Sequence, residues 1–180
     1  MLLVVDNGSI YTKNLIDFLN EKNILLEKQT PQILDLNSLE NYDSIILSGR
    51  RRNEKKINEI NSKIIKYSIK NDVKLLGICY GAEILALTLG GTIRKSFSLQ
   101  KGTEIIKIFK DNPISSNSLH VFESHEFEIS KLPNTLIPLG KSNNCKYEII
   151  AYEKKPIFGT QFHPEMSQDG QDLIEKFCSL

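Results

Sequence analysis

Residues 75–87 read LLGICYGAEILAL, and the pattern of this stretch changes between two glycines. The residues before Gly77 are apolar, as in a buried strand, and those after Gly81 follow the pattern of a helix. Cys79 stands between the two glycines, where the strand would turn into the helix. Glycine permits a tight turn that larger side chains block. The stretch therefore predicts a strand–turn–helix unit with a cysteine at the turn.

The first half of the chain repeats this alternation of strand and helix patterns. Apolar runs occur at 2–5, 24–29, 44–48 and 73–79, and helical patterns at 10–22, 54–70 and 81–89. Unbroken apolar strands that alternate with helices are typical of a parallel sheet covered on both faces. We therefore expect a three-layer α/β fold with a mostly parallel central sheet and helices on both faces.

The pattern changes after Gly90 and Gly91. Short strands separated by turns are expected at 92–95, 103–109, 119–123, 135–139, 147–152 and 156–162, followed by a closing helix at 167–178. These short strands predict a small antiparallel extension or side sheet. No repeat or linker interrupts the chain, so we expect one domain over residues 1–180.

Composition narrows the range of functions. The 180 residues carry 23 basic and 22 acidic side chains, a net charge of +1, which gives no overall attraction to nucleic acid or anionic membranes. Three cysteines are too few, and odd in number, for a disulfide framework. The N-terminal MLLVVDNG lacks the basic segment and the apolar length of a signal peptide. We expect a cytoplasmic protein with free thiols.

Cys79 lies where chemistry would be expected in such a fold. Functional groups collect at the carboxyl ends of parallel strands. At this position the N-terminus of the following helix would lower the pKa of the thiol and offer free amide donors to an anion. The alternative is a small buried core thiol, which is a common fate of cysteine. The local pattern alone favours neither.

The segment PIFGTQFHPEM at 156–166 supplies the groups that a thiol nucleophile needs. His163 and Glu165 are two residues apart, so in extended backbone both side chains leave the same face, and Pro164 stiffens the arrangement. A base activates the nucleophile, and a carboxylate orients the base. Alone, His-Pro-Glu is also compatible with a surface turn. Together with the upstream cysteine, it favours a Cys–His–Glu site.

Both motifs resemble those of the class I glutamine amidotransferases. The resemblance rests on GICYG and GTQFHPE, and it extends over the chain through VVDNG, ILSG at 46–49 and LGGTI at 89–93. It implies a flavodoxin-like fold and hydrolysis of glutamine to glutamate and ammonia, without cofactor or metal. By this resemblance, Cys79 forms a γ-glutamyl thioester, His163 transfers protons and Glu165 orients the imidazole.

The resemblance also implies further site residues. The oxyanion hole would consist of the backbone amides of Tyr80 and Arg50. The remaining residues expected to bind substrate are Gly49, Glu83, Ser124 and His125, although His125 is also compatible with a structural or partner-facing role.

Three positions depart from the family pattern. Ser48-Gly49-Arg50-Arg51 stands where the family has Ser-Gly-Gly-Pro, so an arginine replaces a flexible glycine. Glu83 stands in place of a glutamine, and Phe127 in place of an aspartate. The first change also begins a basic run, SGRRRNEKK, which fits either a solvated loop or a surface that contacts an acidic partner or an anionic substrate.

Within the family, the chain is most similar to free-standing subunits that serve GMP synthesis from XMP, as in archaea. The similarity rests on CYG, on FESHEFEI at 122–129 and on the length of the chain. No phosphate-binding glycine motif is present, so the resemblance implies a separate ATP-dependent synthetase of the ATP-pyrophosphatase type as partner. Three alternatives remain: an amidotransferase of another pathway, such as anthranilate synthesis; a γ-glutamyl hydrolase; and a weakly catalytic relative that acts as a binding module.

Overall fold

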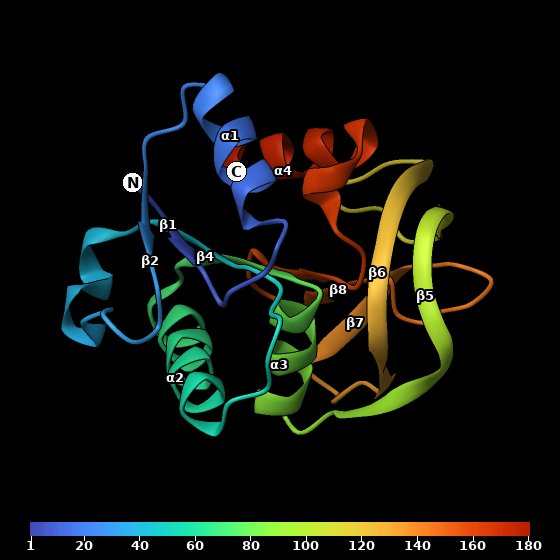
Figure 1. The fold of residues 1–180 in the computed structure, drawn as a ribbon, viewed down its shortest axis with the longest axis horizontal. Coiled ribbons are helices and arrows are strands. Elements are labelled where there is room, and N and C mark those ends of the chain that lie inside the picture. Colours follow the sequence, from blue (N-terminus) through green and yellow to red (C-terminus); the bar gives the residue numbers. More distant parts are fainter.

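The computed structural model describes residues 1–180, which form one nine-stranded sheet with helices on both faces (Figure 1). The strands are β1 (Leu2–Val5), β2 (Leu26–Gln29), β3 (Ser44–Leu47), β4 (Lys74–Ile78), β5 (Thr92–Ile108), β6 (Ser118–Lys131), β7 (Leu136–Lys141), β8 (Ile149–Tyr152) and β9 (Ile157–Thr160). The helices are α1 (Thr12–Glu21), α2 (Lys55–Asn71), α3 (Tyr80–Thr88) and α4 (Gln168–Ser179), with 3₁₀ turns η1 (Leu36–Asn41) and η2 (Pro164–Met166). The order of strands across the sheet is β2-β1-β3-β4-β9-β8-β7-β5-β6.

The first five strands in this order form the parallel half of the sheet. Alternate residues of β1 enter two different cores. Leu2 and Val4 pack in the core that α1 and α4 cover, and Leu3 and Val5 pack in the core under α2 and α3. Because both faces are buried, a strand here must be apolar at every position, which is the pattern the sequence shows.

The other half of the sheet is antiparallel and much larger than expected. Strands β9, β8, β7, β5 and β6 pair antiparallel, so the sheet has four parallel and four antiparallel pairings. The expected α/β fold is confirmed, but the expectation of a mostly parallel sheet holds for only half of the strand pairings, and the antiparallel extension is not small. The segments 92–95 and 103–109 belong to one 17-residue strand, and the strand expected at 119–123 spans 14 residues. Much of β5 is exposed, so its sequence lacks the apolar pattern of a buried strand.

The expected helices are present with small shifts at their ends. The first begins at Thr12, so Ile10 precedes it and is exposed. None of the helices combines the length and apolar character required to span a membrane. The three cysteines are free, and Cys79 and Cys145 are buried.

Candidate active site

Cys79 occupies the turn between β4 and α3 in a strained backbone conformation. Its φ is +50° and its ψ is −102°, which residues other than glycine rarely adopt. A Cβ on Gly77 would lie 2.4 Å from the backbone of Gly81, and one on Gly81 would lie 2.4 Å from the carbonyl oxygen of Leu47. The Cys79 N–H donates to the carbonyl of Thr160 at 2.7 Å. The predicted strand–turn–helix unit is present, and close packing requires both glycines.

The thiol of Cys79 is buried, and its surroundings do not favour the thiolate. Burial raises the pKa of the Cys79 thiol well above its usual range, and the charges of Glu83 and Glu165 raise it further. A hydrogen bond from the backbone of Tyr80 opposes them. The amide of Tyr80 at the start of α3 lowers this pKa, as expected for a helix N-terminus, but desolvation and the two carboxylates outweigh it, so the net shift is opposite to the one expected. Sulfur chemistry here therefore needs a base.

His163 and Glu165 directly follow β9 and are both buried. His163 Nδ1 lies 2.8 Å from Glu165 Oε1. Because a carboxylate only accepts hydrogen bonds, Nδ1 carries the proton and Nε2 is left as the basic nitrogen. The backbone N–H of His163 donates to the carbonyl of Phe122 at 2.9 Å, which joins this turn to β6.

Two residues from the N-terminal half of the chain pack against the His163 ring. The centroid of the Tyr11 ring lies 4.5 Å from it, and the Tyr11 hydroxyl bonds Ser124 Oγ at 3.1 Å. A Cβ on Gly49 would lie 2.9 Å from His163 Cε1, so glycine allows the close approach. Gly49 was predicted as a site residue from the sequence, but no pattern singled out Tyr11.

A cleft of about 260 Å³ opens beside Cys79. It lies between the loop at 50–53, the start of α3 and the β6 segment at 124–127. Six expected site residues line it: Arg50, Cys79, Tyr80, Glu83, Ser124 and His125. Four larger hollows lie elsewhere, and none of them is lined by Cys79. His163, Glu165 and Gly49 do not line the cleft itself.

Arg50 fixes the loop on one side of this cleft. Its guanidinium lies 4.1 Å from the centroid of the Tyr80 ring, within the range of a cation–π contact. Arg50 Nη1 donates to Asn53 Oδ1 at 2.7 Å and to Asn58 Oδ1 at 3.0 Å, and the Tyr80 hydroxyl donates to the same Asn58 oxygen at 2.8 Å. The arginine that replaces a family glycine thus fastens its loop to the first turn of α3.

Glu83 lies on the cleft and is almost fully buried. Burial raises the pKa of its carboxyl, although the amide of Gln161, which donates to Glu83 Oε1 at 3.3 Å, and the charge of Arg50 oppose the shift. Gln161 belongs to the quoted GTQFHPE motif, but no pattern in the sequence links it to Glu83.

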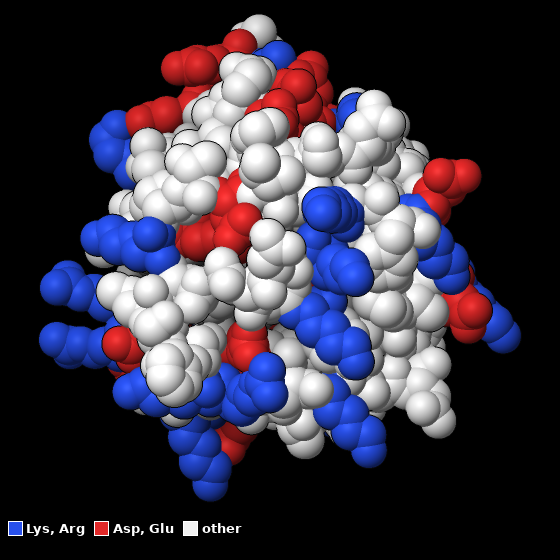
Figure 2. Space-filling model, turned by 90° about the vertical axis from the view of Figure 1, so that its right-hand side faces the viewer, with Lys and Arg blue, Asp and Glu red and all other residues white.

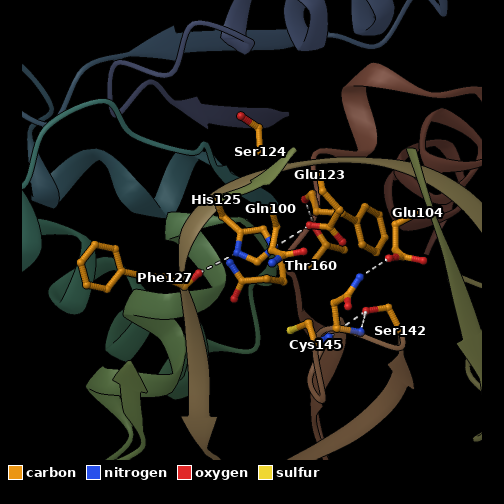
Figure 3. Close-up of polar contacts among 12 residues, drawn as sticks. Gln100, Glu104, Glu123, Ser124, His125, Phe127, Ser142, Cys145 and Thr160 are labelled. Carbon is orange, nitrogen blue, oxygen red and sulfur yellow. Dashed lines mark hydrogen bonds and ion pairs between the residues drawn. The ribbon is translucent and has the colours of Figure 1, made fainter. Parts of the chain in front are cut away.

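An acid–histidine cluster lies behind the cleft (Figure 3). His125 Nδ1 lies 2.8 Å from the carbonyl oxygen of Phe127, and Nε2 makes a 2.7 Å ion-pair contact with Glu123 that is not aligned as a hydrogen bond. Burial alone would lower the pKa of His125, but Glu123 and the Phe127 carbonyl raise it. Burial and the charge of Glu123 raise the pKa of Glu148 well above its usual range. The ring of His125 and the carboxyl groups of Glu123 and Glu148 thus form one buried cluster of interacting titratable groups.

Glu123 and Glu148 were not predicted from the sequence. Alternation along β6 was a usable signal for the first, because Glu123 and His125 are two apart and share a face of the strand. Glu148 comes from a distant segment, and nothing in the sequence connects it to the other two.

A parallel α/β sheet with a cysteine at a strained strand-to-helix turn, and a buried His–Glu pair after the adjacent strand, is typical of enzymes that use a thiol for acyl transfer. Comparison with known proteins identifies the family. The family model "Glutamine amidotransferase class-I" matches residues 3–179. The chain belongs to the class I glutamine amidotransferase family.

Relatives within this family cover nearly the whole chain. The glutamine-hydrolyzing GMP synthase subunit of Methanocaldococcus jannaschii is 27% identical over 100% of this chain and 97% of its own length. The corresponding subunit of Pyrococcus abyssi is 29% identical over 100% of this chain and 98% of its own. The crystal structure of a Thermoplasma acidophilum protein assigned as a GMP synthase subunit has a TM-score of 0.88 and 28% identity, over 99% of this chain and 92% of that chain. A glutamine amidotransferase from Thermotoga maritima, 22% identical with a TM-score of 0.79 over 97% of this chain and 80% of that chain, shares the fold.

Proposed function

We propose that this chain hydrolyses glutamine through a thioester on Cys79 and passes the ammonia to a separate synthetase subunit for GMP synthesis from XMP. The family assignment supports the first part of the proposal. The second part is supported by relatives named as glutamine-hydrolyzing subunits of GMP synthase, whose length this chain matches. A relative that is named as one subunit implies a second one.

In the proposed first step, Cys79 Sγ attacks the side-chain carboxamide carbon of glutamine while His163 Nε2 takes the thiol proton. Glu165 holds the imidazole in position and stabilises the imidazolium that forms. The backbone N–H groups of Tyr80 and Arg50 would stabilise the oxyanion, and each such donor is typically worth about 10²–10³ in rate. His163 then gives the proton to the amide nitrogen, the C–N bond breaks, and ammonia leaves.

In the second step, water attacks the thioester carbon while His163 Nε2 takes a proton from the water. The C–S bond breaks, the proton returns to sulfur, and glutamate is released. Because burial keeps the Cys79 thiol protonated at rest, the reaction requires His163 in both steps.

The amino-acid end of glutamine would lie along the cleft. Glu83 is suited to pair with the α-ammonium, because a cation there would offset the desolvation of the buried carboxylate. We propose that Gly49, Ser124 and His125 complete this subsite. His125 would act through the charge of its ring, because both ring nitrogens already contact protein groups.

The partner is proposed to be a synthetase of the ATP-pyrophosphatase type. This chain has no phosphate-binding glycine motif of its own, so ATP-dependent activation of XMP would require another polypeptide. We place both in the cytoplasm, where free thiols such as those of this chain remain reduced.

The contact of His163 Nδ1 with Glu165, which leaves Nε2 as the base, carries the proposal. The test is release of ammonia from glutamine by the wild-type chain and by Cys79→Ala, each with and without the synthetase subunit. Cys178→Ala removes a partly exposed thiol outside the cleft and serves as the control. We expect activity to depend on Cys79 and not on Cys178. Absence of ammonia release by wild type under both conditions would refute the proposal.

The raised thiol pKa and the arginine in the oxyanion loop favour a second candidate, a weakly catalytic binding module. A glutamine-like diazoketone distinguishes the two. Selective labelling of Cys79, detected by mass spectrometry and prevented by glutamine, supports the enzyme. No labelling under any condition supports the binding module.

A further inference from the structure

The β5–β6 hairpin exposes large apolar side chains. Phe97 is fully exposed, Leu99 is 57% exposed and Phe127 is 41% exposed. Ile105, also on β5, and Phe109, directly after it, are exposed as well. Exposed apolar side chains gathered on one element mark a contact surface more often than scattered ones do.

Basic side chains alternate with these apolar ones along β5. Lys95, Lys101 and Lys107 are exposed, and none of them has a carboxylate partner. Figure 2 views the molecule from the side on which β5 lies and shows a column of Lys and Arg side chains down this face, with uncharged surface on both sides. We call the row of exposed side chains from Lys95 to Lys107 the β5 row.

The β5 row is continuous with the catalytic cleft. Lys95 pairs in register with Phe127, and Lys101 with Ser124; both β6 residues line the cleft beside Cys79. Cross-strand partners are direct neighbours on one face of a sheet, and Ser124 and Phe127, three residues apart on β6, lie on opposite faces. Lys95 and Lys101 therefore flank the cleft residues of β6 from the two faces of the hairpin, and a partner that covers the cleft mouth would contact both.

The opposite wall of the cleft is also basic. Arg51 and Arg52 line it, and Lys55 and Lys56 follow at the start of α2, where the helix dipole disfavours cations. All four are exposed and have no ion pair. These unpaired cations lie close together in the chain and repel one another, and an acidic surface laid over them would relieve this repulsion.

We propose that the β5 row and the basic residues from Arg51 to Lys56 together form the docking surface for an acidic, partly apolar face of the synthetase subunit. This rests on the proposed function, which requires a second chain to receive the ammonia. The charges would steer association, and Phe97 and Leu99 would supply apolar contact area. Docking here would cover the cleft through which ammonia leaves.

The test compares two double charge reversals of equal size. Lys95→Glu with Lys101→Glu changes the β5 row, and Lys63→Glu with Lys66→Glu changes exposed, unpaired lysines on α2. Affinity for the synthetase subunit from the same organism is measured by titration calorimetry at two salt concentrations. We expect the β5 variant to raise Kd at least tenfold, less so at high salt, and the α2 control to change it less than threefold.

Phe97→Ser tests the apolar part of the surface, and because this side chain is fully exposed the variant should fold normally. We expect at least a fivefold rise in Kd that persists at high salt. Glutamine hydrolysis by the isolated β5 and Phe97 variants should match wild type, because these residues lie outside the catalytic machinery.

Equal Kd values for wild type, the β5 variant and Phe97→Ser would overturn the docking surface while leaving the proposed function intact. Absence of any complex between the wild-type chain and the synthetase subunit would overturn the docking proposal. Ammonia release by the wild-type chain would then decide whether the proposal of glutamine hydrolysis still holds. The β5 variant could instead keep its affinity for the synthetase subunit and lose binding to a single-stranded RNA oligomer, or lose self-association in sedimentation. Either result would show that the synthetase subunit is not the partner of this surface.

Discussion

Cys79 combines a reactive side chain with a backbone conformation that suits glycine. A φ of +50° with a ψ of −102° costs other residues about 1–3 kcal/mol, and alanine keeps that strain. We predict that the free energy of unfolding of the Cys79→Gly variant is about 1 kcal/mol higher than that of the Cys79→Ala variant. At most positions glycine instead gives the less stable protein. Urea unfolding of both variants measures the difference. The control position is Lys63, which is exposed on helix α2. There the free energy of unfolding should be about 1 kcal/mol lower with glycine than with alanine. The same order at both positions would contradict the prediction.

Glu83 controls how readily Cys79 ionises. Its charge raises the pKa of the thiol, and glutamine, the residue the family pattern has here, removes that charge without changing the shape. We therefore predict that Glu83→Gln lowers the pKa of Cys79. The midpoint of iodoacetamide alkylation against pH measures it, with Cys145 and Cys178 replaced by alanine. Glu126→Gln, an exposed acid on the same cleft, should leave the midpoint unchanged. A midpoint that stays constant or rises in Glu83→Gln would refute this role.

At the scale of elements, the packing of α3 against the sheet depends on Gly81. A methyl group there would meet the carbonyl oxygen of Leu47 at 2.4 Å, and a strand backbone has no room to move away. We predict that Gly81→Ala lowers the free energy of unfolding by about 3 kcal/mol. Gly140→Ala is the matched control, because its methyl would meet only side-chain atoms of Ile106, Ile108 and Ile149 at 3.0 Å or more, and it should cost about 1 kcal/mol. Equal losses in urea unfolding would mean that the close contact is not the cause.

The difference in burial between the strands explains which elements could be predicted from the sequence. Strands β1, β3 and β4 are covered on both faces, so nearly every residue in them is apolar and the pattern shows the strand directly. Strand β5 has one short contact with β7 and a largely exposed face, so tertiary pairing with β6, not its own composition, determines its length. Parallel or antiparallel pairing is likewise a property of two segments together.

The residues of the candidate site also fall into those that the sequence could predict and those that depend on the fold. Cys79, His163 and Glu165 lie in two short motifs, and although neither motif was decisive alone, the two together were enough to single out the three groups. Tyr11 and Glu148 reach the site only through long-range packing. The direction of the Cys79 pKa was mispredicted for the same reason, since burial and neighbouring carboxylates depend on the folded chain.

At the scale of the whole molecule, buried groups with raised pKa values make stability depend on pH. The pKa values of Glu83 and Glu148 are raised above the usual 4.5, and that of His125 above 6.5. Above about pH 4.5 for the two acids and above about pH 6.5 for His125, up to the raised value of each group, the folded chain therefore binds more protons than the unfolded chain. Each such proton lowers the free energy of unfolding by about 1.4 kcal/mol per pH unit as the pH rises. We predict that stability falls from about pH 5 to about pH 8.

Glu148→Gln tests the origin of this slope. Glutamine keeps the shape of the protonated acid but cannot ionise, so the variant should lose less stability between about pH 5 and about pH 8 than wild type and should be the more stable of the two at the upper end. Urea unfolding at intervals of half a pH unit measures both curves. Glu126→Gln, which changes an exposed acid on β6, should follow the wild-type curve. A wild-type stability that rises with pH over this range would contradict the prediction, because carboxyl groups with lowered pKa values, such as Asp43, change the proton balance only below about pH 4. Parallel curves for wild type and Glu148→Gln would instead place the excess protons on Glu83 and His125, next to the cleft, where they would also affect catalysis.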